Sequence, residues 1–199
     1  MQGKRARVVA LGGAVREGSS TEKALRHAAD LIDAEVTVFA GNALLLPMYS
    51  PYASARTALA ASWVEAVREA DAVLIASPGY HGGVSGVVKN ALDYLEDLRE
   101  DGQPYLSGRA MGCIVTAAGA QGAVTTLSAL RDIGHALRAW LTPMGVCIAG
   151  MDPAFDADGA CLRPEVARQL QIMAEEINTF VQMRRLLEPQ HSKQFMVAG

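Results

Sequence analysis

The chain has 199 residues, of which half are hydrophobic and a fifth are charged, and its net charge is -3. That length and composition suit a single globular domain with a sizeable core, expected over residues 1–187 and followed by a tail over 188–199. No run of Lys and Arg is dense enough to predict a nucleic-acid partner. No apolar stretch approaches the roughly 20 residues that span a bilayer, so no membrane partner is expected.

The three cysteines, Cys113, Cys147 and Cys161, are far apart in the sequence and form no C-x-x-C pair. An odd number of widely spaced cysteines favours neither a disulfide framework nor a cysteine zinc site. The first apolar run, VVAL, is too short for the core of a signal peptide. The sequence therefore predicts a protein of the reducing cytoplasm.

Short apolar runs alternate with amphipathic segments along the chain. The expected strands cover 7–12, 35–40, 71–77, 109–117 and 143–149. The expected helices cover 21–32, about 55–70, 84–98, 121–141 and 164–187. Because the strand runs lack polar alternation, they are typical of strands buried on both faces. The pattern predicts an α/β fold with a parallel sheet and helices on both of its faces.

In such open sheets, ligands bind beyond the carboxyl ends of the strands. The loops that follow the five expected strands should therefore build any site. These loops cover residues 12–20, 41–54, 77–83, 117–122 and 150–160.

The first of these loops reads GGAVREGSST over residues 12–21. A helix N-terminus favours anions, and this loop adds the guanidinium of Arg16 and the hydroxyls of Ser19, Ser20 and Thr21. A Walker A loop would need a Lys where Ser19 stands, and a dinucleotide fingerprint would need other glycine spacing and an acid after the second strand. The loop therefore indicates a site for a phosphate monoester. The alternative is a plain helix cap made by Ser20 or Thr21.

The third loop belongs to the stretch SPGYHGGVSGVVKN over residues 77–90. Pro78 fixes the backbone, whereas Gly79 and Gly82 free it, so N–H groups can turn toward a ligand. Tyr80 and His81 supply flat surfaces and polar edges. This combination suits a flavin ring system, and the alternative is a tight turn with a solvent-facing His81. We expect His81 to be a contact residue rather than an acid or base.

We find no constellation typical of nucleophilic or acid–base catalysis in the five loops. Asp152, Asp156 and Asp158 follow the last strand, but without the regular spacing of cation ligands they are typical of a turn-rich surface loop. We therefore predict neither a catalytic side chain nor a metal site.

Four segments together resemble the NADPH-dependent FMN reductase family in order and spacing. They are GAVREGSST (13–21), LPMY (46–49), SPGYHGGVSGVVKNALDYL (77–95) and AAGAQG (117–122). The resemblance covers about residues 7–150. It implies a flavodoxin-like three-layer sandwich with a five-stranded parallel sheet in the order 2-1-3-4-5. It also implies hydride transfer from NADPH or NADH to N5 of FMN and onward to an acceptor.

The resemblance also assigns roles to residues of the loops. It implies phosphate contacts from Arg16, Ser19 and Thr21, ring contacts from Pro78, Gly79, Tyr80, His81 and Gly82, and closure of the far side by Ala118, Gly119 and Gln121. Gly79 stands where the family often has Glu, and we expect its missing side chain to leave the ring more open.

Three functions stay open at this point. In the first, FMN turns over as a substrate and reduced FMN passes to an acceptor or to a partner monooxygenase. In the second, FMN is retained and the protein reduces quinones, azo dyes or metal oxyanions. In the third, the protein is a flavodoxin-like electron carrier without turnover, which the small net charge of -3 supports little.

The helix expected over 84–98 has an unusually broad apolar face. Its apolar residues are Val84, Val87, Val88, Ala91, Leu92, Tyr94, Leu95 and Leu98. A helix packed only on its own sheet needs a narrower stripe. We interpret the face as a subunit interface of a homodimer or homotetramer, as is typical of the family, and the alternative is a wide core face.

Overall fold

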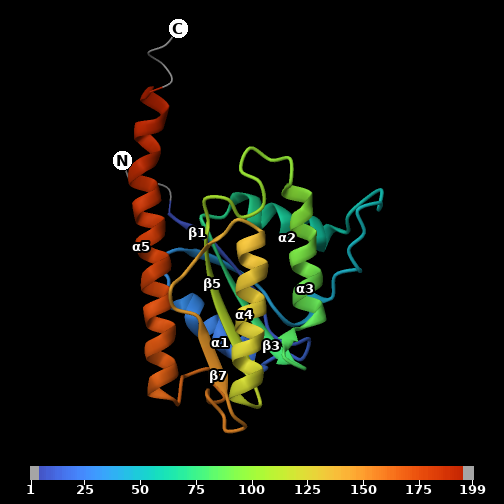
Figure 1. Ribbon diagram of the computed structural model, residues 1–199, viewed down its shortest axis with the longest axis vertical. Coiled ribbons are helices and arrows are strands. Elements are labelled where there is room, and N and C mark those ends of the chain that lie inside the picture. The colour runs from blue at the N-terminus through green and yellow to red at the C-terminus, as the bar shows by residue number, and fades with distance from the viewer. Residues whose placement is uncertain (1–4, 195–199) are drawn as a thin grey trace.

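The computed structural model describes residues 5–194, which form a parallel sheet between two layers of helices (Figure 1). The sheet has the order β2-β1-β3-β5, and β6 and β7 share the far edge of β5. The parallel strands are β1 (Arg7–Gly12), β2 (Glu35–Phe39), β3 (Ala72–Tyr80), β5 (Ala110–Ala117), β6 (Trp140–Leu141) and β7 (Val146–Ala149). The expected α/β fold and its flavodoxin-like strand order are confirmed.

Helices cover both faces of the sheet. They are α1 (Ser20–Asp30), α2 (Ala58–Glu69), α3 (Gly86–Asp93), α4 (Ala120–Ala136) and α5 (Pro164–Gln194), with short 3-10 helices η1 (Gly41–Leu44) and η2 (Tyr94–Leu98). Successive side chains of a strand point to opposite faces. On β1, Val9 and Leu11 therefore join the core under α2, α3 and α4, whereas Val8 and Ala10 join the core under α1 and α5. Nowhere in residues 5–194 does a helix combine the length and the apolar character that crossing a membrane requires.

The third loop differs from the expectation, because it is a β-hairpin. Strand β3 does not end at Ser77 but continues to Tyr80, and Gly83–Val84 (β4) pairs with it antiparallel. His81 and Gly82 form the two-residue turn between them, with φ angles of 53° and 77°. Two consecutive positive φ angles are typical of a type I′ turn, whose twist matches that of the flanking strands.

The helix expected over 121–141 ends earlier, and the strand expected over 143–149 covers only Val146–Ala149 (β7), while Trp140–Leu141 (β6) forms a short strand where the helix was expected to end. Helix α4 ends at Ala136, and Arg138 takes a left-handed φ of 65°. Its guanidinium lies over the ring of Tyr105, 5.4 Å from the ring centre. Helices commonly end through one left-handed residue, but Gly is usual there, so Arg138 gave no signal in the sequence.

The last helix is longer than expected. Helix α5 does not end at 187 but continues through Pro189 to Gln194 (Figure 1). Residues 188–194 therefore extend the helix, and 195–199 lie outside the described residues. The division into a domain over 1–187 and a tail over 188–199 stays a prediction.

The broad apolar face at 84–98 belongs to the core of the chain itself. Six of its members are at most 3% exposed: Val88, Ala91, Leu92, Tyr94, Leu95 and Leu98. They pack with α2 and η1 as well as with the sheet, so the width of the face is explained without a second subunit. The alternative of a wide core face accounts for this observation.

The long segment between η1 and α2 is fixed to α3 and η2. The side-chain amide of Asn90 donates to the Pro47 carbonyl at 2.9 Å, and its oxygen accepts the Tyr49 N–H at 2.8 Å. Arg56 donates to both carboxylate oxygens of Asp97, at 2.7 Å each. These bonds hold an irregular segment in one conformation beside the carboxyl edge of the sheet.

Candidate functional site

The first loop ends in a well-formed helix cap. Ser19 is the N-cap of α1, and its Oγ accepts the N–H groups of Ala14 and Glu22, each at 3.2 Å. The carboxylate of Glu22 accepts the Gly18 N–H at 2.9 Å, so Ser19 and Glu22 brace the loop from both sides. The cap that the sequence offered as an alternative is present, and Ser19 rather than Ser20 or Thr21 makes it.

The cap leaves donors on the loop that are free to bind an anion. The N–H groups of Ser20 and Thr21 lie in the first turn of α1, where a helix offers no internal partner. Arg16 is exposed, and within residues 5–194 no ion pair or hydrogen bond engages its guanidinium. The Ser20 side chain is also exposed. These groups form a cationic, donor-rich rim at a helix N-terminus, which favours phosphate.

Thr21 is buried and faces the centre of the sheet rather than the rim. Its hydroxyl lies 2.5 Å from the hydroxyl of Thr116, at the end of β5. This bond joins the first loop to the neighbouring carboxyl end. The side chain of Thr21 thus positions the loop, whereas its N–H remains available.

The hairpin at the end of β3 presents Tyr80 and His81 to solvent. The Tyr80 side chain is 56% exposed, and His81 is exposed at the turn. Pro78 is buried and pairs with Thr116 of β5. At the base, the fully buried Ser77 hydroxyl accepts the Ser85 N–H at 3.0 Å, which closes the hairpin. The flat side chains that the sequence singled out are therefore carried by rigid β-structure.

Gly79 is required by packing against α4. A Cβ atom on Gly79 would meet the Thr126 hydroxyl at 2.8 Å, the Ala117 side chain at 3.2 Å and the Gly122 carbonyl at 3.3 Å. The missing side chain therefore points toward α4. Packing against α4 thus accounts for the glycine, and the expectation that Gly79 leaves the ring more open stays a prediction.

The loop after β5 adds a second helix N-terminus, and this one has no side-chain cap. Gly119 is the N-cap of α4 and has no side chain to accept from the first turn. A Cβ atom there would meet nothing within 4 Å, so the space beside it is open. Ala118 and Gln121 are exposed on either side of it. The first-turn N–H groups of α4 thus face open space at the same edge of the sheet as the first loop.

A cavity of about 440 Å³ lies at this carboxyl edge. It brings together Ser20 from the first loop, Pro78, Gly79 and Tyr80 from the hairpin, and Ala118 from the loop after β5. Five of the twelve residues predicted from the sequence therefore line it. The other seven lie on the same loops but not in the wall: Arg16, Ser19, Thr21, His81, Gly82, Gly119 and Gln121.

The residues of the far wall of the cavity were not predicted from the sequence. It is made by Thr116, by Ile148 at the end of β7, and by the segment from Gly150 to Ala154. Met151 in this segment is 85% exposed. The place of the loop after the last strand was predicted, but nothing in its residue types marked Met151 or Pro153 as wall residues.

Comparison with known proteins agrees with this arrangement. The model of the family described as NADPH-dependent FMN reductase matches residues 6–153. The chain belongs to the NADPH-dependent FMN reductase family. The matched residues include every residue of the cavity wall except Ala154.

Proteins similar to this chain carry names that give different electron acceptors. The chain is 28% identical over 182 residues to an NAD(P)H-dependent FMN reductase of Pseudomonas aeruginosa, covering 90% of this chain and 97% of that one. It is 30% identical over 143 residues to a 2-hydroxy-1,4-benzoquinone reductase of a Burkholderia species, covering 71% and 77%. Among solved structures, the flavoenzyme FerB of Paracoccus denitrificans, an NAD(P)H:(acceptor) oxidoreductase, superposes with a TM-score of 0.73 at 24% identity, covering 90% and 98%.

The residues at the carboxyl edge fit the cofactor that the family name implies. A phosphate needs N–H donors and a cation, which the first turn of α1 and Arg16 provide. A flat ring needs a shallow apolar wall with a few polar groups, which Pro78, Tyr80 and Ile148 provide beside the loop N–H groups. The cavity volume of about 440 Å³ lies within the range of cofactor sites.

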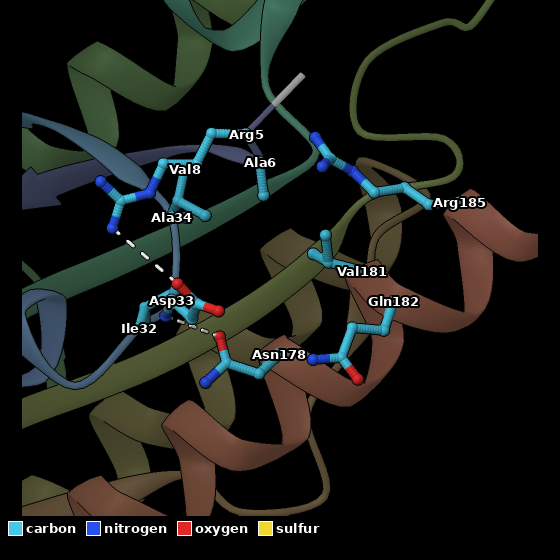
Figure 2. A pocket seen from close by; sticks show the side chains of 10 residues that line it. All are labelled: Arg5, Ala6, Val8, Ile32, Asp33, Ala34, Asn178, Val181, Gln182 and Arg185. Atoms are coloured by element: carbon cyan, nitrogen blue, oxygen red, sulfur yellow. Dashed lines mark hydrogen bonds and ion pairs between the residues drawn. The ribbon is translucent and has the colours of Figure 1, made fainter. Parts of the chain in front are cut away.

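A second cavity, of about 190 Å³, lies at the opposite edge of the sheet (Figure 2). Asp33 connects its walls, because its N–H donates to the Asn178 side chain at 3.0 Å and its carboxylate lies 3.8 Å from Arg5. These contacts tie α5 to the turn between α1 and β2. Because it lies beside the amino end of β1, this cavity belongs to the framework and not to the candidate site.

Metal ligation is not suggested in the part of the chain that the structure describes. Among the side chains that the structure describes, residues 5–187, no group of three or more His, Cys, Asp or Glu is arranged to hold an ion. Asp156 instead accepts the Ala160 N–H at 2.8 Å within its own turn.

Proposed function

We propose that this enzyme binds FMN at the carboxyl edge of its sheet and reduces it with NADPH or NADH. The observation that carries the proposal is the convergence of three loops on one cavity: an anion-binding helix start, a rigid hairpin with flat side chains, and an uncapped helix start. The cofactor, when bound, supplies hydride acceptance from the nicotinamide and electron donation to an acceptor.

In this proposal Arg16, the Ser20 hydroxyl and the first-turn N–H groups of α1 bind the phosphate. Ser19 acts through the backbone, because its Oγ is already engaged by two N–H groups. Thr21 acts in the same indirect way through its bond to Thr116. The residues predicted for the phosphate thus divide into those that touch it and those that hold the loop.

We assign the ring to the hairpin and to the loop after β5. Pro78, Gly79 and Tyr80 form the wall on one side, with His81 and Gly82 in the turn that sets their direction. Ala118, Gly119 and Gln121 flank the uncapped N-terminus of α4, whose N–H groups stabilise negative charge that develops nearby. No side chain needs to transfer a proton in this scheme.

Titration of FMN into the purified protein, followed by absorbance and flavin fluorescence, tests the proposal directly. Binding with an equivalence point near one per chain, and bleaching on addition of NADPH, is the expected result. Absence of binding would contradict the proposal while leaving the family and the fold unaffected.

Retention of FMN during turnover is the second candidate, supported by the names of two relatives. One is the benzoquinone reductase mentioned above, and another, an NADPH azoreductase of a Bacillus species, is 25% identical over 169 residues. A retained cofactor predicts ping-pong kinetics with a quinone or azo dye, whereas free FMN as substrate predicts rates that depend on added FMN. If reduced FMN is instead released, we propose that a partner monooxygenase receives it in the cytoplasm.

A further inference from the structure

Two threonine hydroxyls meet at the edge of the cavity of the candidate site. The Oγ1 atom of Thr21, in the first turn of α1, lies 2.5 Å from Oγ1 of Thr116, near the end of β5. A hydrogen bond between two hydroxyls uses the hydrogen of one group and the oxygen of the other. The pair therefore holds one further hydrogen, and its direction decides what the pair can offer to a ligand.

The burial of Thr21 favours Thr21 as the donor in this bond. Thr21 is 3% exposed and does not line the cavity, whereas Thr116 does. Within the described part of the chain, the Thr21 hydroxyl makes no other hydrogen bond. A buried hydroxyl whose hydrogen finds no acceptor is costly, so the hydrogen of Thr21 is directed at Oγ1 of Thr116.

The hydrogen of the Thr116 hydroxyl is then left for a ligand. Thr116 is half-buried, and among the described residues only Thr21 bonds to its hydroxyl. Because the side of this oxygen that faces α1 is occupied by Thr21, the remaining hydrogen turns toward the cavity. Thr116 thus offers a donor whose orientation is set by the first turn of α1.

Thr116 lies between the two parts of the site to which the proposed function assigns phosphate and ring. Its neighbours in the sheet are Pro78, at the start of the hairpin, and Ile148, in the far wall. Its side chain contacts the first turn of α1, where the phosphate is proposed to bind. In FMN the ribityl chain joins the phosphate to the ring, and its hydroxyl oxygens accept hydrogen bonds. A ligand that spans the two parts of the site brings this chain past Thr116.

We propose that Thr116 donates a hydrogen bond to a hydroxyl oxygen of the ribityl chain, and that Thr21 orients Thr116 for this role. The inference rests on the proposed binding of FMN and adds to it a residue that recognises the polyol. Contacts to phosphate and ring alone would accept any chain of suitable length between them. A donor at Thr116 disfavours a chain without hydroxyls, because such a chain leaves the donor without an acceptor.

The test compares FMN with an analogue in which an unsubstituted pentyl chain joins the phosphate to the ring. Thr116→Val removes the hydroxyl at nearly constant volume and should weaken FMN binding roughly threefold to tenfold, as expected for one lost hydrogen bond. Affinity for the analogue should not change, because its chain offers nothing to Thr116. Fluorescence titration of both flavins into the unchanged chain and the variant measures the four affinities, whose differences form a double-mutant cycle.

Stability measurements separate ligand binding from support of the fold. Thr116→Val leaves the buried Thr21 hydroxyl without a partner, so it should lower the unfolding midpoint without ligand. Adding Thr21→Val replaces both hydroxyls by methyl groups and should recover most of this loss, whereas FMN affinity should stay low because the donor is still absent. Thr116→Ser keeps the hydroxyl and should restore FMN affinity.

Thr142 provides the matched control. It is a buried threonine outside the cavity wall, and its hydroxyl donates to the Met144 carbonyl at 2.8 Å. Thr142→Val should lower the unfolding midpoint and leave the affinity for FMN unchanged. A loss of FMN affinity in this variant as large as that in Thr116→Val would show an effect of stability alone and would overturn the inference.

Three other results would also overturn the inference. Equal weakening of FMN and of the analogue by Thr116→Val would place the hydroxyl at the phosphate or the ring. Unchanged FMN affinity in Thr116→Val would remove Thr116 from the site, and recovery of affinity in the double variant would assign it to the fold alone. In these cases the unchanged chain still binds FMN, so the proposed function stands. Failure of the unchanged chain to bind FMN would instead overturn the proposed function, and this inference with it.

Discussion

The hydroxyl of Thr126 lies 2.8 Å from the point that a Cβ atom on Gly79 would occupy. Thr126 is fully buried in α4 and also donates to the Gly83 carbonyl, across the hairpin, at 3.4 Å. The position of the hairpin relative to α4 is therefore set by one glycine and one threonine. This relationship links the geometry of the hairpin to the second turn of α4, the helix whose N-terminus faces the candidate site.

Gly79→Ala should destabilise the protein by about 1–3 kcal/mol, because the added methyl group must displace Thr126 or the hairpin. Thr126→Ala makes room for that methyl group, so the double substitution should be less destabilising than the sum of the two single ones. Urea unfolding of the four proteins measures this coupling. Strict additivity would show that the methyl group is accommodated in another way.

Arg16→Ala should weaken FMN binding roughly tenfold to hundredfold, as expected for the loss of a charge-assisted hydrogen bond. The unfolding midpoint should not change, because within residues 5–194 Arg16 is exposed and engaged in no ion pair or hydrogen bond. Arg168→Ala removes an exposed arginine from α5 and serves as the matched control. Equal FMN affinity in the two variants would remove Arg16 from the phosphate site.

Ser19→Ala and Ser20→Ala should differ in their effects on stability and on FMN binding, although the residues are neighbours. Ser19 caps α1, so its loss should lower the free energy of unfolding by about 1 kcal/mol. Ser20 is exposed in the cavity, so its loss should weaken FMN binding with little effect on stability. Thermal unfolding without ligand, combined with FMN titration, separates the two effects.

Cys113 should resist alkylation in the folded protein. Burial in the core disfavours the charged thiolate, which raises the pKa of Cys113 to about 12. The thiol therefore loses its proton only as the pH approaches that value, and at pH 8 about one molecule in ten thousand is ionised. Mass spectrometry after iodoacetamide treatment should find Cys113 modified only once the protein is unfolded. Modification of Cys113 in the native protein at pH 8 would be inconsistent with this environment.

The sheet and its loops could be predicted because local and long-range requirements agree there. The runs at Val8–Leu11 and Val73–Ile75 are apolar throughout, since both faces of these strands are covered. That pattern implies a parallel sheet, and the topology then brings Ser20 and Pro78 to one edge. The edge at which the candidate loops meet follows from this reasoning, whereas the order of the strands was implied by the resemblance to the family.

Features that depend on a single tertiary contact could not be predicted in the same way. Arg138 ends α4 in a left-handed conformation that its sequence does not favour, and the Tyr105 ring supports it. The need for glycine at position 79 depends on Thr126, which lies 47 positions later in the chain and leaves no room for a Cβ atom. The apolar face at 84–98 suggested a partner because its contacts with α2 are invisible in the sequence. In each case the deciding neighbour comes from another element.

The hairpin that carries Tyr80 is the direct extension of β3, whose residues from Ala72 to Pro78 are all buried in the centre of the sheet. Its amide protons should therefore exchange with solvent at rates near those of the core rather than those of a surface loop. A ligand that meets this hairpin finds its backbone already ordered, so little conformational entropy remains to be lost on binding. Selection among flat ligands would then depend on the exposed side chains of the rim, such as Met151, and not on closure of a lid.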